Sequence, residues 1–402
     1  MIDDPKALLV DVALEALGAV EPRGLVADAL AGWQPTHADV LVLAAGKASR
    51  AMAAAAVEAI DRPVRGGVVT PDGGHVDGLE VLVGTHPIPS EASARAGERL
   101  LELAHSATPG TSVLVLLSGG ASALCSVPAA GIEVDDLVRF SSRLIRSGAP
   151  IEDLNTVRSA LSRFKAGGLG GALGGAGEVR VLAISDVVGS DPAVIASGPT
   201  VPRPVEPMHA IEVAERWGIE VNGHLRKAIL AAEIPERRFY PVEVIADGQT
   251  LARAAVDVAR ARGVDAGLGW TVTGEARRTA AAVVAGARPG LTAHAGETVV
   301  TDAGTLPGGR NQEAALAAAR ALPTAAASAF LALGSDGIDG TTDDAGAVVD
   351  DHTWEAIRAA GFDPTSLLDV HDAHTALGAV GSLIHTGRTG TNVADLWLVW
   401  RP

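Results

Sequence analysis

The stretch DVLVLAAGKASRAMAAAAVEAI, residues 39–60, passes from an apolar run into an alanine-rich segment across a Gly-Lys pair. The apolar run is typical of a buried strand and the segment after it of a helix. Strand and helix patterns of this kind alternate along most of the chain, which predicts an α/β protein with mostly parallel sheets flanked by helices. The further apolar runs lie at 66–70, 79–84, 112–118, 178–185, 240–246, 297–301, 328–334 and 394–400.

Length and composition predict two domains. The chain has 402 residues, of which 48% are hydrophobic and 20% charged, as expected for a globular protein with a sizeable core. The most proline-rich stretch, 196–207, is followed by polar helices, and we place the boundary after them near residue 238. The predicted domains are therefore 1–238 and 239–402.

Charge and cysteine content exclude several classes of partner and location. Thirty-two basic residues against 48 acidic ones argue against a nucleic-acid surface, which needs clustered cations. One cysteine, Cys125, excludes an internal disulfide and fits a reducing compartment, so we expect a cytoplasmic protein. The N-terminus, residues 1–20, has acids where a signal peptide has cations and reads as an amphipathic helix. No apolar run approaches the roughly 20 residues of a membrane span.

Lys47 is one of only four lysines, and the pattern places it in the first turn of a helix. Cations are mildly disfavoured there, so a solvated lysine is the plain interpretation. The position becomes favourable if an anion docks on the same helix end, because lysine then supplies a mobile point charge for phosphate oxygens.

The stretch LLSGGASALCSVP, 116–128, predicts a strand, a glycine turn and a helix. Ser118, Gly119, Gly120 and Ser122 lie in this turn. Glycines let the backbone approach an anion, and a helix N-terminus offers amide donors, so the turn is either a phosphate cradle or simply a tight connection. The chain contains neither GxxxxGK[ST] nor GxGxxG, so any bound nucleotide must be held by a loop of another kind.

A second polar group follows in residues 152–173. Asn155, Arg158, Ser162 and Lys165 are spaced by three, four and three, which on one helix gives a shared face. This face either meets a carboxylate or phosphate or is an ordinary exposed surface.

Polar residues also follow later strands. Asp186 ends the run 178–185, where a carboxylate can hold Mg²⁺ or accept a hydroxyl proton. Arg310 precedes a predicted helix and resembles a bidentate anion clamp, although a surface arginine fits as well. Asp336 belongs to an acidic turn that lacks EF-hand spacing, so it is a weak metal signal.

Together these stretches resemble the type II glycerate 2-kinase family, whose C-terminal part is the MOFRL domain. The resemblance covers nearly the whole chain. It rests on AAGKAS (44–49), HPIPSEAS (86–93), LLSGGASAL (116–124), LNTVRSALSRFKAGGL (154–169), AISDVVGSDPAVIASGPT (183–200), VTGEAR (272–277), AGET (295–298), GGRNQEAAL (308–316), GSDGIDGTTDDAGAVVD (334–350) and HTGRTGTNVADLWLVW (385–400).

The resemblance implies a larger Rossmann-like N-terminal domain, a smaller MOFRL-type domain, and an active site in the cleft between them. It implies ATP-dependent phosphorylation of D-glycerate at its 2-hydroxyl, giving 2-phosphoglycerate, with Mg²⁺ serving the nucleotide. ATP and D-glycerate are the expected partners, without nucleic acid or membrane, and a homodimer is left open.

Roles carried over from the resemblance fall into three sets. The catalytic set is Lys47, Asp186, Arg310 and Asp336, with Asp186 also the candidate metal ligand. The nucleotide and phosphate set is Ser118, Gly119, Gly120, Ser122 and Lys165. The substrate set is His86, Asn155, Arg158 and Glu275.

Three departures from the family pattern bear on specificity. Ala121 stands where the family has a third glycine, which requires a negative φ. Arg388 replaces a proline and His374 a serine or tyrosine, so a related hydroxy acid is an alternative substrate. An NAD(P)H-dependent hydroxypyruvate reductase and a non-catalytic sensor of sugar acids are the rival functions.

Overall fold

The computed structural model describes residues 2, 4–232, 236–301, 304, 306–323 and 327–402. These residues form two compact units, which are described one at a time. The parallel-sheet unit comprises 22–184 and 190–245. The mixed-sheet unit comprises 1–21, 185–189 and 246–402.

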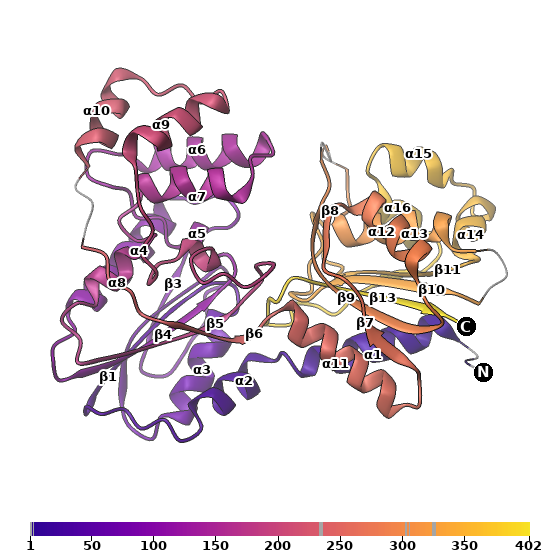
Figure 1. The fold of residues 1–402 in the computed structure, drawn as a ribbon, viewed down its shortest axis with the longest axis horizontal. Coiled ribbons are helices and arrows are strands. Elements are labelled where there is room, and N and C mark those ends of the chain that lie inside the picture. The colour runs from indigo at the N-terminus through magenta and orange to yellow at the C-terminus, as the bar shows by residue number, and fades with distance from the viewer. Residues whose placement is uncertain (1, 3, 233–235, 302–303, 305, 324–326) are drawn as a thin grey trace. The chain divides into compact units, whose positions relative to one another are not determined.

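The parallel-sheet unit is built on a six-stranded sheet with the order β3-β2-β1-β4-β5-β6 (Figure 1). Neighbouring strands from β3 to β5 run parallel, as predicted, and the order is that of a Rossmann-like fold. The strands are β1 Asp39–Ala45, β2 Val64–Thr70, β3 Glu80–Val83, β4 Thr111–Ser118, β5 Glu178–Ile184 and β6 Val242–Ala246.

Helices cover this sheet and build an extension beside it. All eight residues of β4 are buried, which explains its unbroken apolar run. A separate apolar cluster that includes Phe140, Leu144 and Ile211 joins α6, α7, α9 and α10. The helices are α2 Pro22–Leu30, α3 Ser49–Ala59, α4 Glu91–His105, α5 Ala121–Leu124, α6 Val134–Arg146, α7 Ile151–Ala160, α8 Gly168–Ala172, α9 Pro207–Arg216 and α10 Gly223–Ala231.

The mixed-sheet unit has a sheet of order β12-β11-β10-β13-β9-β7, with β8 also paired to β9. Its strands are β7 Ala266–Leu268, β8 Val272–Glu275, β9 Gly290–Val299, β10 Ala329–Gly334, β11 Gly346–Asp350, β12 Leu383–Ile384 and β13 Asp395–Arg401. Its helices are α1 Pro5–Gly18, α11 Gly248–Ala261, α12 Ala276–Gly286, α13 Arg310–Ala321, α14 Thr353–Ala359, α15 Pro364–Asp369 and α16 Ala373–Gly378. Within the described ranges, no helix of either unit is both long and apolar enough to cross a membrane.

The prediction of a mostly parallel sheet is wrong for this second unit. The pairs β10–β11, β10–β13, β11–β12 and β13–β9 are antiparallel, and only β7 and β8 run parallel to β9 among the described strands. The connection from β10 to β11, residues 335–345, contains no helix. Because parallel neighbours need a crossover of about a dozen residues or more, this short loop returns the chain antiparallel.

The division of the chain also differs from the predicted contiguous domains 1–238 and 239–402. The N-terminal helix forms as predicted, but α1 packs against α11, β10 and β11 of the mixed-sheet unit. It buries Leu9, Val12 and Ala13, and Lys6 forms an ion pair with Asp350 at 3.1 Å. The apolar face of α1 therefore joins the first residues of the chain to its C-terminal part.

Candidate functional site

Strands β1 and β4 are neighbours at the point where the strand order of the sheet reverses, and the turns after them are bonded together. The amide of Lys47 donates to the carbonyl of Gly119 at 2.9 Å, and the amide of Ala48 donates to Ser118 Oγ at 3.0 Å. Gly46 has φ +132°, and a Cβ on it would overlap Ser118. Ligands of open α/β sheets bind at this kind of switch point.

Lys47, His86 and Gly120 meet beside these turns. A Cβ on Gly120 would lie 3.1 Å from His86 Cδ2 and 3.2 Å from Lys47 Cγ, and Gly120 has φ +83°. The loops after β1, β3 and β4 therefore converge on one backbone position that only glycine suits. We call Lys47, His86, Gly119, Gly120 and Ser122 the Lys47 cluster.

Two details of this cluster correct the sequence interpretation. Helix α3 begins at Ser49, so Lys47 lies in the preceding turn and not in the first helical turn. Helix α5 has only four residues, so the predicted helix dipole at the glycine turn is weak. Ala121 begins α5 and is absent from the residues with positive φ, as the replacement of glycine by alanine requires.

Ser118 lies beneath the turn, where its fully buried hydroxyl accepts the Ala48 amide. This contact gives Ser118 a role in joining the two turns, and the phosphate-binding role expected for it stays a prediction. Gly119 is buried as well, whereas Gly120 and Ser122 are half-buried. The accessible part of the predicted cradle is therefore Gly120 and Ser122.

A chain of polar side chains leads from Ser122 into the interior. Ser122 Oγ lies 2.8 Å from Ser197 Oγ, and the Ser197 hydroxyl donates to Asn155 Oδ1 at 2.9 Å. Because a hydroxyl has one proton, Ser122 must be the donor to Ser197. Asn155 is 2% exposed, and its Nδ2 has no hydrogen-bond partner. A buried amide without an acceptor is rare in folded proteins and marks a candidate ligand contact.

The shared helical face predicted for residues 152–173 does not form. Asn155 and Arg158 lie on α7, which ends at Ala160, whereas Ser162 and Lys165 lie in the turns that follow. After α7 the backbone bonds with an earlier segment, since the carbonyl of Leu161 accepts the amide of Ala129 at 2.9 Å and the amide of Arg163 donates to the carbonyl of Val127 at 3.0 Å.

Lys165 nevertheless lies close to the glycine turn. Its Nζ is buried and donates to Ser126 Oγ at 3.4 Å, and the Ser126 hydroxyl donates to the carbonyl of Ser122 at 2.9 Å. Burial, with the nearby Arg158 charge, lowers the pKa of Lys165 well below its usual value. Burial also lowers the pKa of Arg158. An anion bound near this pair would offset both effects.

Ser197 was missed by the sequence analysis. It lies in the left-handed region with φ 62°, next to Ala196 with φ 54°. Non-glycine residues in this region are strained and gather at functional sites. The segment SGPT was visible in the sequence, but nothing in its composition indicates that Ser197 connects Ser122 to Asn155.

In the mixed-sheet unit, Arg310 begins α13 and is held by two carboxylates. Its Nε and Nη2 donate to the two oxygens of Asp395 at 2.7 and 2.9 Å, and Nη1 lies 2.9 Å from Glu297 Oε1. Burial works against the charged guanidinium, but Asp395 and Glu297 raise its pKa well above the usual value. Arg310 therefore makes the predicted bidentate contact, but its partner in this structure is the carboxylate of Asp395.

Asp339 extends this cluster at the start of α13. Its oxygens accept the backbone amides of Asn311 and Gln312 at 3.1 and 2.8 Å. Asn311 Nδ2 also donates to Asp395 at 3.1 Å, and Trp397 Nε1 donates to Asn311 Oδ1 at 2.8 Å. Burial raises the pKa of Asp339 to about 7 despite the two amide donors. We call Glu297, Arg310, Asn311, Asp339 and Asp395 the Arg310 cluster.

The other predicted residues of this unit lie on loops and strand ends. Asp186 Oδ2 accepts Asn392 Nδ2 at 2.9 Å, which identifies Asn392 as a neighbour that the sequence analysis missed. Asp336 Oδ1 accepts the amide of Ile338 at 3.2 Å within an acidic turn. Glu275 ends β8 and accepts the hydroxyl of Thr301, with no described bond to the Arg310 cluster.

The predicted residues thus form groups inside each unit. Nine of them belong to the parallel-sheet unit: His86, Lys47, Ser118, Gly119, Gly120, Ser122, Asn155, Arg158 and Lys165. Four belong to the mixed-sheet unit: Asp186, Glu275, Arg310 and Asp336. The expected placement of the active site between two domains stays a prediction.

Comparison with known proteins identifies relatives over the full chain. Residues 8–230 match a family model described as a domain of unknown function (DUF4147), and residues 291–395 match the MOFRL family. The chain is 35% identical to D-glycerate 2-kinase of Thermotoga maritima over 97% of each protein. A relative from Agrobacterium vitis, provisionally named a hydroxypyruvate reductase, is 36% identical over 89% of this chain and 86% of its own. A crystal structure of Thermotoga maritima glycerate kinase covers 99% of both chains with a TM-score of 0.87 and 34% identity.

Proposed function

We infer that this chain, which belongs to the glycerate 2-kinase family built from DUF4147 and MOFRL regions, phosphorylates D-glycerate at its 2-hydroxyl with ATP. The products are 2-phosphoglycerate and ADP. The chain is an enzyme of the phosphotransferase class, and ATP is its second substrate.

The observation that carries the proposal is the convergence of Lys47, His86 and Gly120 at the switch point of a parallel sheet. Phosphoryl transfer depends mainly on positioning and on stabilising the charge of the transferred group. We propose that Lys47 supplies a cation for that group. Gly120 and Ser122 would offer backbone amides to the phosphates without a P-loop.

Asn155 and Lys165 support an anion site at the same place. The unpartnered Nδ2 of Asn155 is a donor that awaits an acceptor, such as an oxygen of glycerate. Lys165 lies behind the glycine turn, where an arriving anion would restore its charge. We propose that His86 and Arg158 complete the substrate set.

We propose that the mixed-sheet unit contributes Asp186, Arg310 and Asp336 to the same reaction. Asp186 is the candidate to accept the proton of the 2-hydroxyl or to hold Mg²⁺. Three of the five N–H donors of Arg310 bind carboxylates in the described structure, so a phosphate would use the remaining donors or replace a carboxylate. Glu275 has the weakest support, because its described partner is Thr301.

Magnesium fits the available donors as a companion of the nucleotide. No group of three His, Cys, Asp or Glu side chains placed to hold a metal occurs among the described residues. Mg²⁺ commonly binds through one or two carboxylates, waters and substrate phosphates, and here it would neutralise part of the phosphate charge. Asp186 has the oxygen chemistry for such a site.

A coupled assay tests the activity and the position of the phosphate. Purified protein is supplied with ATP, Mg²⁺ and D-glycerate, and the product is offered to enolase with and without phosphoglycerate mutase. Phosphoenolpyruvate formed with enolase alone supports 2-phosphoglycerate. Formation that requires the mutase would assign the phosphate to the 3-position, and absence of ADP would contradict kinase activity.

The reductase alternative is tested in the same preparation. The chain has no GxGxxG sequence for a nicotinamide dinucleotide. We therefore expect no oxidation of NADH or NADPH with hydroxypyruvate. A sensor without catalysis would bind glycerate but release no ADP, so the kinase assay separates that alternative as well.

A further inference from the structure

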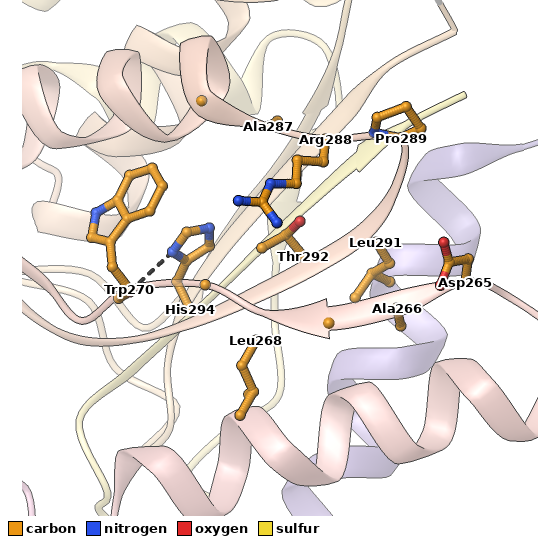
Figure 2. A pocket seen from close by; sticks show the side chains of 13 residues that line it. Asp265, Ala266, Leu268, Trp270, Ala287, Arg288, Pro289, Leu291, Thr292 and His294 are labelled. Carbon is orange, nitrogen blue, oxygen red and sulfur yellow. Dashed lines mark hydrogen bonds between the residues drawn. The ribbon is translucent and has the colours of Figure 1, made fainter.

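The mixed-sheet unit contains a pocket that is lined by none of the residues assigned to the reaction. Its volume is about 460 Å³, and β7, the end of α12 and the start of β9 surround it. Figure 2 shows Trp270, Arg288, Thr292 and His294 around this space, with Asp265 on the side away from Trp270. Neither the Lys47 cluster nor the Arg310 cluster includes any of these residues.

The floor of the pocket is bare backbone. Gly267 lies opposite Thr292 in the β7–β9 register, and a Cβ on Gly267 would have no atom within 4 Å. A Cβ on Gly269 would overlap the His294 ring, and one on Gly286 would lie 3.0 Å from the Trp270 ring. Three glycines therefore leave a slot with a flat wall, a shape that suits a planar ligand.

His294 forms the inner wall of the slot and is 1% exposed. Its Nδ1 lies 3.0 Å from the carbonyl oxygen of Trp270, so Nδ1 carries the proton. Burial lowers the pKa of His294, which keeps the ring neutral and makes Nε2 an acceptor. Nε2 has no described partner, and in Figure 2 it is turned to the side where the Arg288 guanidinium lies.

The other lining groups divide by charge. Arg288 is exposed, has no described carboxylate partner, and extends over Thr292 in Figure 2. Asp265 lies at the other side of the pocket and disfavours an anion there. Trp270 is 47% exposed and meets His294 edge-on, with ring centroids 4.7 Å apart. The exposed part of its ring is available for stacking.

We propose that this pocket binds a small planar anion, a heteroaromatic ring that carries an N–H or amino donor and a carboxylate or phosphate group. The anionic group binds Arg288, the ring donor binds His294 Nε2, and the ring packs on Gly267 and Trp270. This arrangement uses Arg288 and His294 Nε2, leaves the Thr292 hydroxyl as a further hydrogen-bonding group, and keeps the negative charge away from Asp265.

Binding is measured by calorimetry in the absence of ATP and glycerate, so it does not depend on the kinase reaction. The probes are indole-2-carboxylate and indole-3-carboxylate, which carry a ring N–H and a carboxylate but are not nucleotides. Gly267→Val plugs the slot without a clash, because its Cβ has open space, no positive φ is recorded, and valine suits a strand. Arg288→Gln removes the cation, and Arg253→Gln on α11 is the matched control, since Arg253 is exposed and outside the pocket.

We expect at least one probe to bind with a Kd below about 1 mM. Arg288→Gln should weaken that binding by about tenfold or more, and Gly267→Val should abolish it. Arg253→Gln and Lys47→Ala should leave it unchanged, which separates this pocket from the nucleotide site. Failure of both probes to bind, or binding that survives Gly267→Val in folded protein, would overturn the proposal.

Discussion

The Arg310 cluster and the residues next to the Lys47 cluster both contain a cation, but the two cations differ in the partners that the protein gives them. Arg310 is paired with Asp395 and Glu297 through three N–H donors. Near the Lys47 cluster, by contrast, Lys165 Nζ has the Ser126 hydroxyl at 3.4 Å as its described partner, and Asn155 keeps a buried donor without an acceptor. The donors of Arg310 are paired within the protein, whereas Lys165 and Asn155 offer donors that suit an anion.

The contrast indicates which contacts support the fold and which groups are available to a ligand. Removing one member of a satisfied buried pair leaves an uncompensated charge, which destabilises the protein. Removing a cation whose main partner is a bound ligand lowers activity but changes the free energy of unfolding little. Activity and stability measured together therefore distinguish the two clusters.

Arg310→Ala should give the largest combined effect. Asp395 is fully buried, and loss of the guanidinium should lower the free energy of unfolding by about 3 kcal/mol. If Arg310 also stabilises transferring charge, kcat should fall by a factor on the order of 100. Denaturant unfolding and the coupled assay measure the two effects.

Arg320→Ala on the same helix is the control for this variant, because Arg320 is exposed near the end of α13. Arg320→Ala should change neither the free energy of unfolding nor kcat strongly. Unchanged stability of Arg310→Ala would contradict the inference that the Arg310 cluster supports the fold.

Lys47→Ala should lower kcat by a factor on the order of 100 as well, with a smaller loss of stability than Arg310→Ala. Lys47 is half-buried, whereas Arg310 pairs with a fully buried carboxylate, and the substitution keeps the backbone bonds of the Lys47 turn. Kinetics and thermal unfolding of the same preparation test this. Normal kcat in folded Lys47→Ala would refute its assigned role.

The local structure around the two clusters could be predicted only in part from the sequence. The β1 to α3 stretch predicted the strand and the helix after it, because alternating apolar runs indicate a parallel sheet and its functional edge, but it placed Lys47 inside the helix and not in the turn before it. The single helix drawn through Asn155 and Lys165 was wrong, since spacing cannot reveal that the backbone after Ala160 leaves the helix to bond with residues 127–129. Pairing across distant segments, such as Arg310 with Asp395, leaves no local sequence signal.

Lys165→Met should raise thermal stability at pH 7 and lower activity. The pKa of Lys165 is lowered well below 10.5, so its charged form is disfavoured in the folded protein. The unfolded chain binds the proton of Lys165 more tightly than the folded chain does. Burial of the ammonium group therefore lowers the free energy of unfolding at low pH, and this loss fades as pH rises from the folded pKa towards 10.5. The stability gained by the variant should shrink over that window.

Lys227→Met on α10 is the matched control, because Lys227 is exposed. It should show no such gain. A Lys165→Met protein that is less stable than wild type at pH 7 would mean that the ammonium group supports the fold, against the contrast drawn between the clusters.

Asp339→Asn should give the smallest effect, visible as a change in pH dependence. Burial raises the pKa of Asp339 from 3.8 to about 7, so the folded state prefers the protonated carboxyl. The resulting contribution to stability is complete below pH 3.8 and is lost as pH rises through about 7. Asparagine cannot titrate, and it gives up one of the two amide bonds to residues 311 and 312. The free energy of unfolding of the wild type should therefore exceed that of the variant most at acidic pH. The difference should narrow towards pH 8 in denaturant unfolding.

A constant difference across that pH range would mean that Asp339 stays ionised, stabilised by its two amide donors and Arg310. The Arg310 cluster would then carry one more negative charge than we infer.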